Sequence, residues 1–282
     1  VYTAARLTRS GVSLQGTLLL AFVVQEEPCE GGALRLLLEG QNLRPDWVIL
    51  GEPSNLQIMR GHRGRVLFRV TVHGRSSHGS QPELGRNAIM DAARLIFGLD
   101  ILSTDLDVDP FLGQGTLAVT HITSQSASMN AIPDTCVFHI DRRLTAGETP
   151  TRAQAQIERI IQREGIPAEV AIAEYRAHSY TGYEVVAPEA FNAWLLPDQH
   201  PLVHTATGAL RVVRQDEEHV IGRWAFSTDG VYSMGERAIP TIGFGPGDPA
   251  CAHTPREKTR LADVVQAAHV YAVMSVMLLG TA

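Results

Sequence analysis

The chain has 282 residues, of which 44% are hydrophobic and 19% charged, with a net charge of −6 and an isoelectric point near 6.0. This composition is typical of a soluble globular protein, and the lack of a basic excess argues against a nucleic-acid partner. We identify no apolar run of the roughly 20 residues that a membrane span needs, so no membrane partner is expected. The three cysteines, Cys29, Cys136 and Cys251, are widely spaced and form no disulfide pattern. This predicts a reducing, cytoplasmic setting.

The first residues are predicted to end an amphipathic helix that stops at Gly11. Because the chain starts with Val1 in such a helix, we expect it to be a fragment of a longer protein. The apolar run from Thr17 to Val24 predicts a strand covered on both faces, and Glu26-Glu27 follow it. An isolated pair of this kind is most simply a solvated turn. Two adjacent carboxylates otherwise need a positive partner, of which a metal ion is the usual one.

A helix is predicted over 31–38 and a short strand over 47–50, which Gly51-Glu52-Pro53 closes. This alternation predicts an α/β catalytic domain with a mostly parallel sheet. Functional groups of such sheets lie beyond the carboxyl ends of the strands. Glu26, Glu27 and Glu52 are therefore expected at one edge, where three carboxylates favour a metal site.

The pattern changes at residue 61. Strands are predicted over 65–72, 115–122, 135–140 and 168–173, and helices over 85–99, with Asn87 near the start, and 150–163. This β-α-β-β-α-β order is that of a ferredoxin-like unit, so 61–175 is predicted to be an inserted α+β domain. The acidic segment 100–109 is expected to be a solvated linker.

The catalytic domain is expected to occupy 1–60 and to resume over 176–282. Helices are predicted over 191–194, 203–213 and 262–279. A short strand from Trp224 runs into the turn Thr228-Asp229-Gly230. Another, over 239–244, runs into Gly245-Pro246-Gly247, and His253 follows.

Seven motifs occur in one order over nearly the whole chain: Glu26-Glu27, Gly51-Glu52-Pro53, Gly74-Arg75-Ser76-Ser77-His78, Asn130-Ala131-Ile132-Pro133-Asp134, Asp141-Arg142-Arg143, Thr228-Asp229-Gly230, and Gly245-Pro246-Gly247 with His253. Each motif alone is weak, but the ordered set resembles the M20 family of zinc hydrolases. That family includes acetylornithine deacetylase, succinyl-diaminopimelate desuccinylase, aminoacylase and glutamate carboxypeptidase. Residues 141–145 also resemble its YgeY-type subgroup.

The resemblance implies a role for each matched residue. Glu26 would be the general acid/base, Glu27 and His253 would bind one zinc, and Glu52 would bind the other. Two such cations, about 3.5–4 Å apart, polarise an amide carbonyl and activate water, while a carboxylate outside the metal shell moves the proton. His78 would donate to the oxyanion, in this family across a dimer interface.

The remaining matched residues would bind substrate. Asn130 and Arg143 would contact it directly, Arg143 through bidentate bonds to a carboxylate. Thr228, Asp229 and the backbone from Gly245 to Gly247 would line the rest of the pocket. Simpler interpretations remain open. In these, His78 is an exposed loop residue, Asn130 is a turn residue, Arg143 is a surface partner of Asp141 and His253 is a core residue. The other histidines have no motif support and are expected to be structural: His62, His73, His121, His139, His178, His200, His204, His219 and His269.

We therefore predict a zinc-dependent deacylase or carboxypeptidase acting on N-acyl amino acids or small peptides. Cobalt or manganese could replace zinc, and the inserted domain would form a homodimer. The family's earlier His-x-Asp and its metal-bridging Asp would lie upstream of Val1, so we expect the chain as given to bind zinc weakly and to hydrolyse little. The alternative is a non-catalytic or incomplete homologue that serves as a dimerising or ligand-binding protein.

Overall fold

The computed structural model describes residues 1–215 and 220–281. The chain divides into two compact units, one made of Val1–His62 with Trp194–Ala282 and the other of Arg63–Ala193. The second unit extends beyond the boundary expected at residue 175. Its additional residues form a hairpin, β9 (Glu174–His178) with β10 (Glu184–Pro188), and then β11 (Ala190–Phe191). Since β11 pairs with the first long strand of the same unit, this segment packs with Arg63–Ala193.

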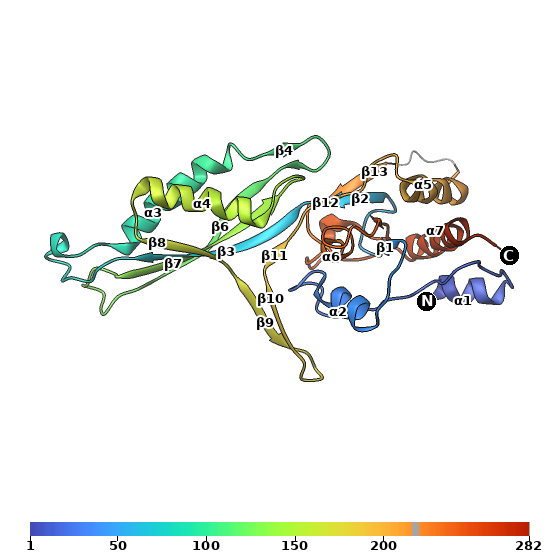
Figure 1. The fold of residues 1–282 in the computed structure, drawn as a ribbon, viewed down its shortest axis with the longest axis horizontal. Coiled ribbons are helices and arrows are strands. Elements are labelled where there is room, and N and C mark those ends of the chain that lie inside the picture. The colour runs from blue at the N-terminus through green and yellow to red at the C-terminus, as the bar shows by residue number, and fades with distance from the viewer. Residues whose placement is uncertain (216–219, 282) are drawn as a thin grey trace. The chain divides into compact units, whose positions relative to one another are not determined.

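The second unit is built on an antiparallel sheet whose main strands are ordered β8-β3-β7-β6 (Figure 1). Its elements are β3 (Gly64–His73), α3 (Ala88–Ser103), β6 (Thr116–Gln125), β7 (Thr135–Leu144), α4 (Pro150–Glu164) and β8 (Ala168–Ile172). The predicted β-α-β-β-α-β order is therefore present, with a short 3-10 turn η1 (Pro82–Leu84) before α3. This strand order is that of the ferredoxin-like fold.

Alternation of side chains along these strands produces the core of the second unit. Every second residue of β3 and β7, such as Phe68 and Phe138, is fully buried against α3 and α4. Helix α3 begins at Ala88 rather than at the predicted residue 85, because the Asn87 side chain caps it by accepting hydrogen bonds from the amides of Ile89 and Met90. Thr149 caps α4 in the same way.

The acidic segment 100–109 is not a solvated linker throughout. Its first residues complete α3, and Leu106 is only 4% exposed. Asp107 pairs with Arg152 at 2.7 Å. The segment then enters a small hairpin of β4 (Val108–Asp109) and β5 (Gly113–Gln114). Apolar residues between the acidic ones pull this part of the chain onto the unit, and charge counting alone does not reveal this.

The first unit contains a mixed sheet rather than the mostly parallel one predicted. Its strands are β1 (Val48–Leu50), β2 (Ile58–His62), β12 (Trp194–Leu195), β13 (Ile221–Trp224) and β14 (Thr241–Gly243). β1 pairs with β14, and β13 with β2, in parallel, whereas β14 and β12 pair with β2 in antiparallel fashion. The predicted helix over 191–194 is wrong, because Phe191 ends β11 and Trp194 begins β12. Strand β2 was not predicted.

Helices cover this sheet and close the core of the first unit. They are α1 (Tyr2–Arg9), α2 (Gly32–Gly40), α5 (Pro201–Val213), α6 (Gly230–Ser233) and α7 (Leu261–Leu279), with a 3-10 turn η2 (Pro249–Cys251). Buried residues of α5 and α7, such as Leu202 and Val270, pack with Ile58 and Phe244 of the sheet region. Helix α7 confirms the helix predicted over 262–279. Its 19 residues are enough, by length and composition only, to cross a membrane.

The apolar run from Thr17 to Val24 is not a strand. The structure shows it as irregular backbone with Leu19 53% and Phe22 76% exposed. Among the described residues no strand pairs with it, and the isolated bridge between Leu14 and Thr281 lies before it. A strand gains its backbone hydrogen bonds from a neighbour, so β-forming side chains alone do not produce one.

A buried ion pair links β7 to the start of α4. Arg142, 1% exposed, donates to the carboxylate of Glu148, whose other oxygen accepts the Thr145 amide at 2.8 Å. Gly115 makes room for the guanidinium, since a Cβ there would lie 2.6 Å from Arg142 Nη1. Burial lowers the pKa of Arg142, and the Glu148 charge opposes that shift. Each charge thus depends on the other for its compensation.

Replacing Glu148→Ala is expected to lower the free energy of unfolding by about 3–5 kcal/mol, because it leaves a buried guanidinium without its carboxylate. Urea unfolding of the full chain measures this change. Glu184→Ala is the matched control, since Glu184 also pairs with an arginine, Arg176 at 2.7 Å, but at the exposed surface. Equal effects of the two substitutions would contradict a structural role for the buried pair.

Candidate active site

The carboxyl ends of β1 and β14 lie together because the two strands are parallel neighbours. Glu52 follows β1, and Gly245 follows β14. A Cβ on Gly245 would lie 2.3 Å from the Glu52 carbonyl oxygen, so only glycine allows this approach. Ser54 fastens the two loops together, since its hydroxyl accepts the Gly245 amide at 3.0 Å. The predicted Glu52 and glycine-rich loop are therefore neighbours at one edge of the sheet.

The Glu26-Glu27 turn leads into α2 in the same unit. Gln25 before it has φ of +58° and Gly31 after it has φ of +76°, so left-handed residues bound the turn. The Gly31 amide donates to Asp229 Oδ1 at 2.6 Å. The Ser227 hydroxyl donates to Glu30 Oε1 at 2.7 Å. These bonds join the turn to the loop between β13 and α6.

Carboxylates from three segments gather around Glu26. Burial raises the pKa of Glu26 to about 8, and the charges of Glu52, Asp229, Glu30 and Glu27 add to this shift in decreasing order. Burial also raises the pKa of Glu52, with further contributions from Asp229 and Glu27. The predicted convergence of the Glu pair and Glu52 is thus reflected in their mutual electrostatics. A cation placed among these groups would relieve their repulsion.

His253 reaches the Glu27 carboxylate. Its Nε2 lies 3.3 Å from Glu27 Oε2, and both side chains are largely exposed. The His253 backbone has φ of +59° and its amide donates to Glu257 Oε2 at 3.1 Å. His253 is therefore not a core histidine. Imidazole and carboxylate are the donor types that zinc takes, and this pair fits the predicted shared metal.

A complete metal shell is not assembled among the described residues. Over 1–215 and 220–281, no three histidine, cysteine, aspartate or glutamate side chains are grouped so that they could hold one ion. The structure thus brings Glu27 and His253 into contact, and the Glu27 charge acts on Glu52. The chemistry of the donor set fits a metal, and the arrangement accounts for part of a coordination shell.

Thr228 and Asp229 are buried within the protein. Thr228 is 0% exposed and its hydroxyl lies 3.2 Å from His62 Nδ1, while the His62 ring packs against Trp194 at 5.3 Å between centroids. Asp229 is 7% exposed. Burial raises the pKa of Asp229, and its bond from Gly31 opposes the shift. The structure therefore gives both side chains intramolecular partners near the site.

In the second unit, the structure brings His78 and Asn130 together. His78 forms a bridge with Ala131, and the Gly79 amide donates to the Asn130 carbonyl at 2.6 Å. The His78 ring contacts the Ser80 hydroxyl at 2.7 Å, and the Asn130 side chain accepts a bond from Ser128. Both residues are at least partly exposed. Their polar groups are therefore accessible on one surface of this unit.

Arg143 lies on β7 and forms two hydrogen bonds with Asp141, at 2.7 and 3.1 Å. This is the ion pair that the simpler reading of the motif expects. The pair is about a quarter exposed, so the guanidinium remains available to a ligand. The neighbouring Arg142 points to the opposite face, as alternation along a strand requires, and is the buried partner of Glu148.

Sequence reasoning missed several residues beside the site. Glu30 and Ser227 bond across the turn, His62 supports Thr228, and Tyr271 of α7 donates its hydroxyl to the Phe244 carbonyl. Burial and the Glu52 charge raise the pKa of Tyr271. Glu30 lies close to the Glu26-Glu27 motif and Ser227 directly precedes Thr228, so their position in the sequence could have identified them. The sequence contains no signal that would have identified His62 or Tyr271. His219, which was expected to be structural, lies outside the described residues.

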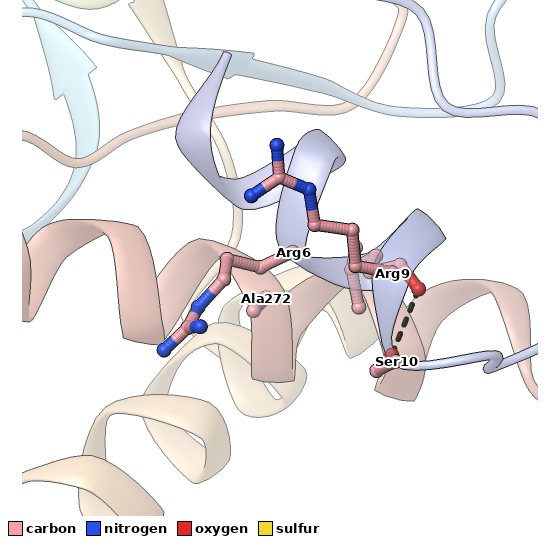
Figure 2. Close-up of a pocket in the computed structure, with 5 residues that line it drawn as sticks. Arg6, Arg9, Ser10 and Ala272 are labelled. Atoms are coloured by element: carbon pink, nitrogen blue, oxygen red, sulfur yellow. Dashed lines mark hydrogen bonds between the residues drawn. The ribbon is translucent and has the colours of Figure 1, made fainter.

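A separate pocket contains none of the predicted site residues. It has a volume of about 330 Å³ and is lined by Arg6, Leu7, Arg9, Ser10 and Ala272 (Figure 2). The Ser10 hydroxyl in it donates to the Leu7 carbonyl at 2.8 Å. This pocket forms where α1 meets α7, and its lining includes no carboxylate, so it offers no metal site.

Sequence comparisons relate the chain to known proteins. Residues 60–169 match the model of the peptidase dimerisation domain of the M20 family. The chain is 38% identical over 281 residues to the uncharacterized protein YgeY of Escherichia coli K12, covering all of this chain and 70% of that protein. It is 31% identical over 251 residues to the acetylornithine deacetylase of Salmonella heidelberg, covering 86% of this chain and 60% of the relative.

Solved structures show the same fold. The aminopeptidase PepT of Bacillus cereus superposes with a TM-score of 0.72 at 15% identity, over 98% of this chain and 68% of that one. The YXEP protein of Bacillus subtilis, described as a dinuclear metal-binding peptidase from the M20 family, gives 0.66 at 18% identity, over 99% and 70%. Residues 60–169 match the M20 dimerisation domain, and the identity to YgeY extends over the whole chain. The chain therefore belongs to the M20 family of peptidases and deacylases.

Proposed function

We propose that this protein is a metal-dependent amide hydrolase, a deacylase or carboxypeptidase, acting on N-acyl amino acids or small peptides. The observation that carries the proposal is Glu26: a partly buried carboxyl group with its pKa raised to about 8, beside the Glu27–His253 pair. A group that titrates near neutral pH can both accept and deliver a proton. The similarity to an acetylornithine deacetylase supports the substrate class.

Zinc is the proposed metal, with cobalt or manganese as substitutes. Glu27 and His253 would hold one ion, and Glu52 would contribute to a second. When bound, the metal would polarise the amide carbonyl and lower the pKa of water. The structural likeness to YXEP, a dinuclear metal-binding peptidase, supports two ions. The positive charge would also lower the pKa of Glu26 and favour its role as a base.

Glu26 is proposed to take the proton of the attacking water and to give it to the leaving amine. His253 contacts Glu27, and the proposed metal shell leaves the Glu26 carboxyl group outside it. In the second unit, His78 is proposed to donate to the oxyanion of the tetrahedral intermediate, from a partner subunit's copy of this surface. Asn130 and Arg143 would bind the substrate, with Arg143 contacting its carboxylate.

Thr228 and the Gly245 to Gly247 backbone are proposed to shape the substrate pocket. Thr228 is fixed by His62, and the glycine loop is fixed by Ser54. Both segments therefore present rigid backbone at the edge where Glu52 emerges. Rigid supports of this kind would limit which acyl groups and amino acids reach a bound metal.

Where the protein binds zinc and hydrolyses an N-acyl amino acid, Glu26→Gln is expected to lower kcat by about 10²–10⁴-fold, because the amide can neither accept nor deliver the proton. Metal content, measured by elemental analysis after dialysis against trace zinc, should match that of the unaltered protein. Glu184→Gln, an exposed change in the second unit, should retain full activity. Turnover retained in Glu26→Gln would exclude Glu26 as acid/base. A protein without bound zinc or turnover would instead favour a non-catalytic dimerising homologue.

The metal-free protein should lose stability as pH rises. Glu26 has a pKa of about 8 when folded against 4.5 for its ordinary value. The unfolded chain therefore ionises first. The stabilising contribution of protonated Glu26 is complete below pH 4.5 and disappears as pH rises toward 8.

Glu26→Gln removes this loss, so in metal-free protein it should raise Tm more at pH 8 than at pH 5, by about 2–4 °C for each kcal/mol that the ionised carboxylate costs. Thermal scans at both pH values with a chelator present measure the difference. An equal effect of Glu26→Gln at the two pH values would show that Glu26 is already ionised at pH 5. Added zinc should reduce the difference, because a cation favours the ionised carboxylate.

We further propose that the second unit forms a homodimer, as its match to a dimerisation domain supports. Met90, Phe97 and Ile101 on α3 are 63%, 71% and 67% exposed, and their spacing places them on one side of the helix. Strand β6 lies at the edge of the sheet, and within the described residues no strand pairs with its outer side. An apolar helix face beside an open strand edge is a surface that another copy can cover.

Phe97→Asp should therefore convert the dimer to a monomer, which light scattering after size-exclusion chromatography detects. The expected cause is the burial of an unpaired charge in an apolar interface. Tyr180→Asp is the control, since Tyr180 is 94% exposed at the tip of the β9–β10 hairpin, off this helix. A dimer that survives Phe97→Asp unchanged would place the interface elsewhere.

A further inference from the structure

The carboxylate of Asp229 is directed away from the helix that follows it. Asp229 occupies the position before α6, where an aspartate ordinarily caps the helix, but its side chain makes no capping bond there. Oδ1 instead accepts the Gly31 amide at 2.6 Å, across 198 residues of sequence. Asp229 is 7% exposed, so this bond is shielded from water.

A second buried bond joins the same two segments. The Ser227 hydroxyl donates to Glu30 Oε1 at 2.7 Å, one residue from the Gly31 contact. Glu30 is 9% exposed and Ser227 6%. Two adjacent bonds between the same segments fix both the distance and the rotation of the turn, which a single bond would leave free to pivot.

Steric fit holds the turn against α6. A Cβ on Gly31 would lie 2.6 Å from Val231 Cγ2 and 2.9 Å from Tyr232 Cβ. Glycine at this position, with φ of +76°, lets the backbone approach α6 directly. Packing against α6 and the two hydrogen bonds therefore both hold the turn in place.

The loop that supplies these bonds is itself anchored. Thr228 lies between Ser227 and Asp229, and its hydroxyl contacts His62 Nδ1 at 3.2 Å and accepts the Gly230 amide at 3.2 Å. His62 ends β2 and is fully buried. Hydrogen bonds therefore join His62 of the sheet to the loop, and the loop to the turn that carries Glu26 and Glu27.

We propose that Asp229 and Glu30 are positioning residues that set the place of Glu26 and Glu27 through the Gly31 amide and the Ser227 hydroxyl. This inference rests on the proposed function. It gives the Asp229 carboxylate a role that differs from substrate contact. What Asp229 must supply is then a hydrogen-bond acceptor, and its negative charge is secondary. That distinction separates Asp229→Asn, which keeps an acceptor oxygen, from Asp229→Ala, which does not.

The experiment compares Asp229→Ala with Asp229→Asn in the metal-loaded protein. Asp229→Ala should weaken zinc binding and lower kcat by about 10- to 100-fold, the usual cost of losing a group that supports a ligand. It should leave KM nearly unchanged. Amide exchange of a peptide covering 26–32 should become faster by at least about tenfold, because the Gly31 amide loses its acceptor. Asp229→Asn should restore most of all three quantities.

The Ser227–Glu30 bond is tested by a double-mutant cycle. Ser227→Ala and Glu30→Ala should each speed exchange of 26–32, and the double variant should add little to either single change. Glu30→Gln, which keeps an acceptor oxygen, should resemble the unaltered protein. Ser227→Ala removes only a hydroxyl, so it keeps the proposal testable if Asp229→Ala does not fold. Strict additivity of the Ser227 and Glu30 effects would contradict a shared role.

Asp109→Ala is the matched control. Asp109 also accepts backbone amides, those of Phe111 and Leu112 at 2.8 and 2.6 Å, but in the second unit. It should lower Tm without changing zinc affinity or exchange of 26–32. If Asp229→Asn is as damaging as Asp229→Ala, the charge contacts metal or substrate and the proposal is wrong. Unchanged exchange in Asp229→Ala overturns it as well.

These readouts separate the inference from the proposed function. If the unaltered protein neither binds zinc nor hydrolyses amides, the proposed function fails, and exchange of 26–32 still decides whether Asp229 and Glu30 fix the turn. If zinc binds and turnover occurs while exchange is insensitive to Asp229, the function stands and the positioning role fails.

Discussion

Repulsion among carboxylates at one edge of the first unit is the constraint on which the rest of the site depends. Glu26, Glu52 and Asp229 each have a pKa raised by burial, and neighbouring carboxylate charges add to each shift. A protein does not gather such groups without structural support, because separating them would be favourable. The support here consists of buried hydrogen bonds from a backbone amide and a hydroxyl, together with the Glu27–His253 contact. The same repulsion explains why a divalent cation suits this location.

The pairing of β1 with β14 brings the parts of the site together. Parallel neighbours end at the same edge, so Glu52 and the Gly245 loop meet although they are far apart in sequence. Gly245 permits the close approach, and Gly31 does the same for the turn against α6. These two glycines have the same physical role, which is to let backbone occupy space that any side chain would fill. The second unit achieves its own organisation by another route, through strand alternation and two capped helices.

Local signals predicted the elements that local forces control. The strands predicted over 65–72 and 135–140 and the helix with Asn87 near its start depend on neighbouring residues, and the structure contains all three. The run from Thr17 to Val24 failed because a strand is defined by its partner, which sequence pattern does not supply. Residues 191–194 failed for a related reason: Phe191 and Trp194 are apolar enough for a helix face, but pairing with β3 and β2 decides their conformation.

By itself the sequence determined the order of chemical groups: the Glu pair, Glu52, His78, Asn130, Arg143, the Thr228-Asp229-Gly230 turn and His253. It also determined the ferredoxin-like order of the second unit, because periodicity and caps act over a few residues. Only the tertiary structure decided that Asp229 bonds to Gly31, that Ser227 bonds to Glu30 and that His253 contacts Glu27. The first two contacts join residues 198 and 197 positions apart, and their geometry arises from packing of the whole unit. No local pattern encodes such distances.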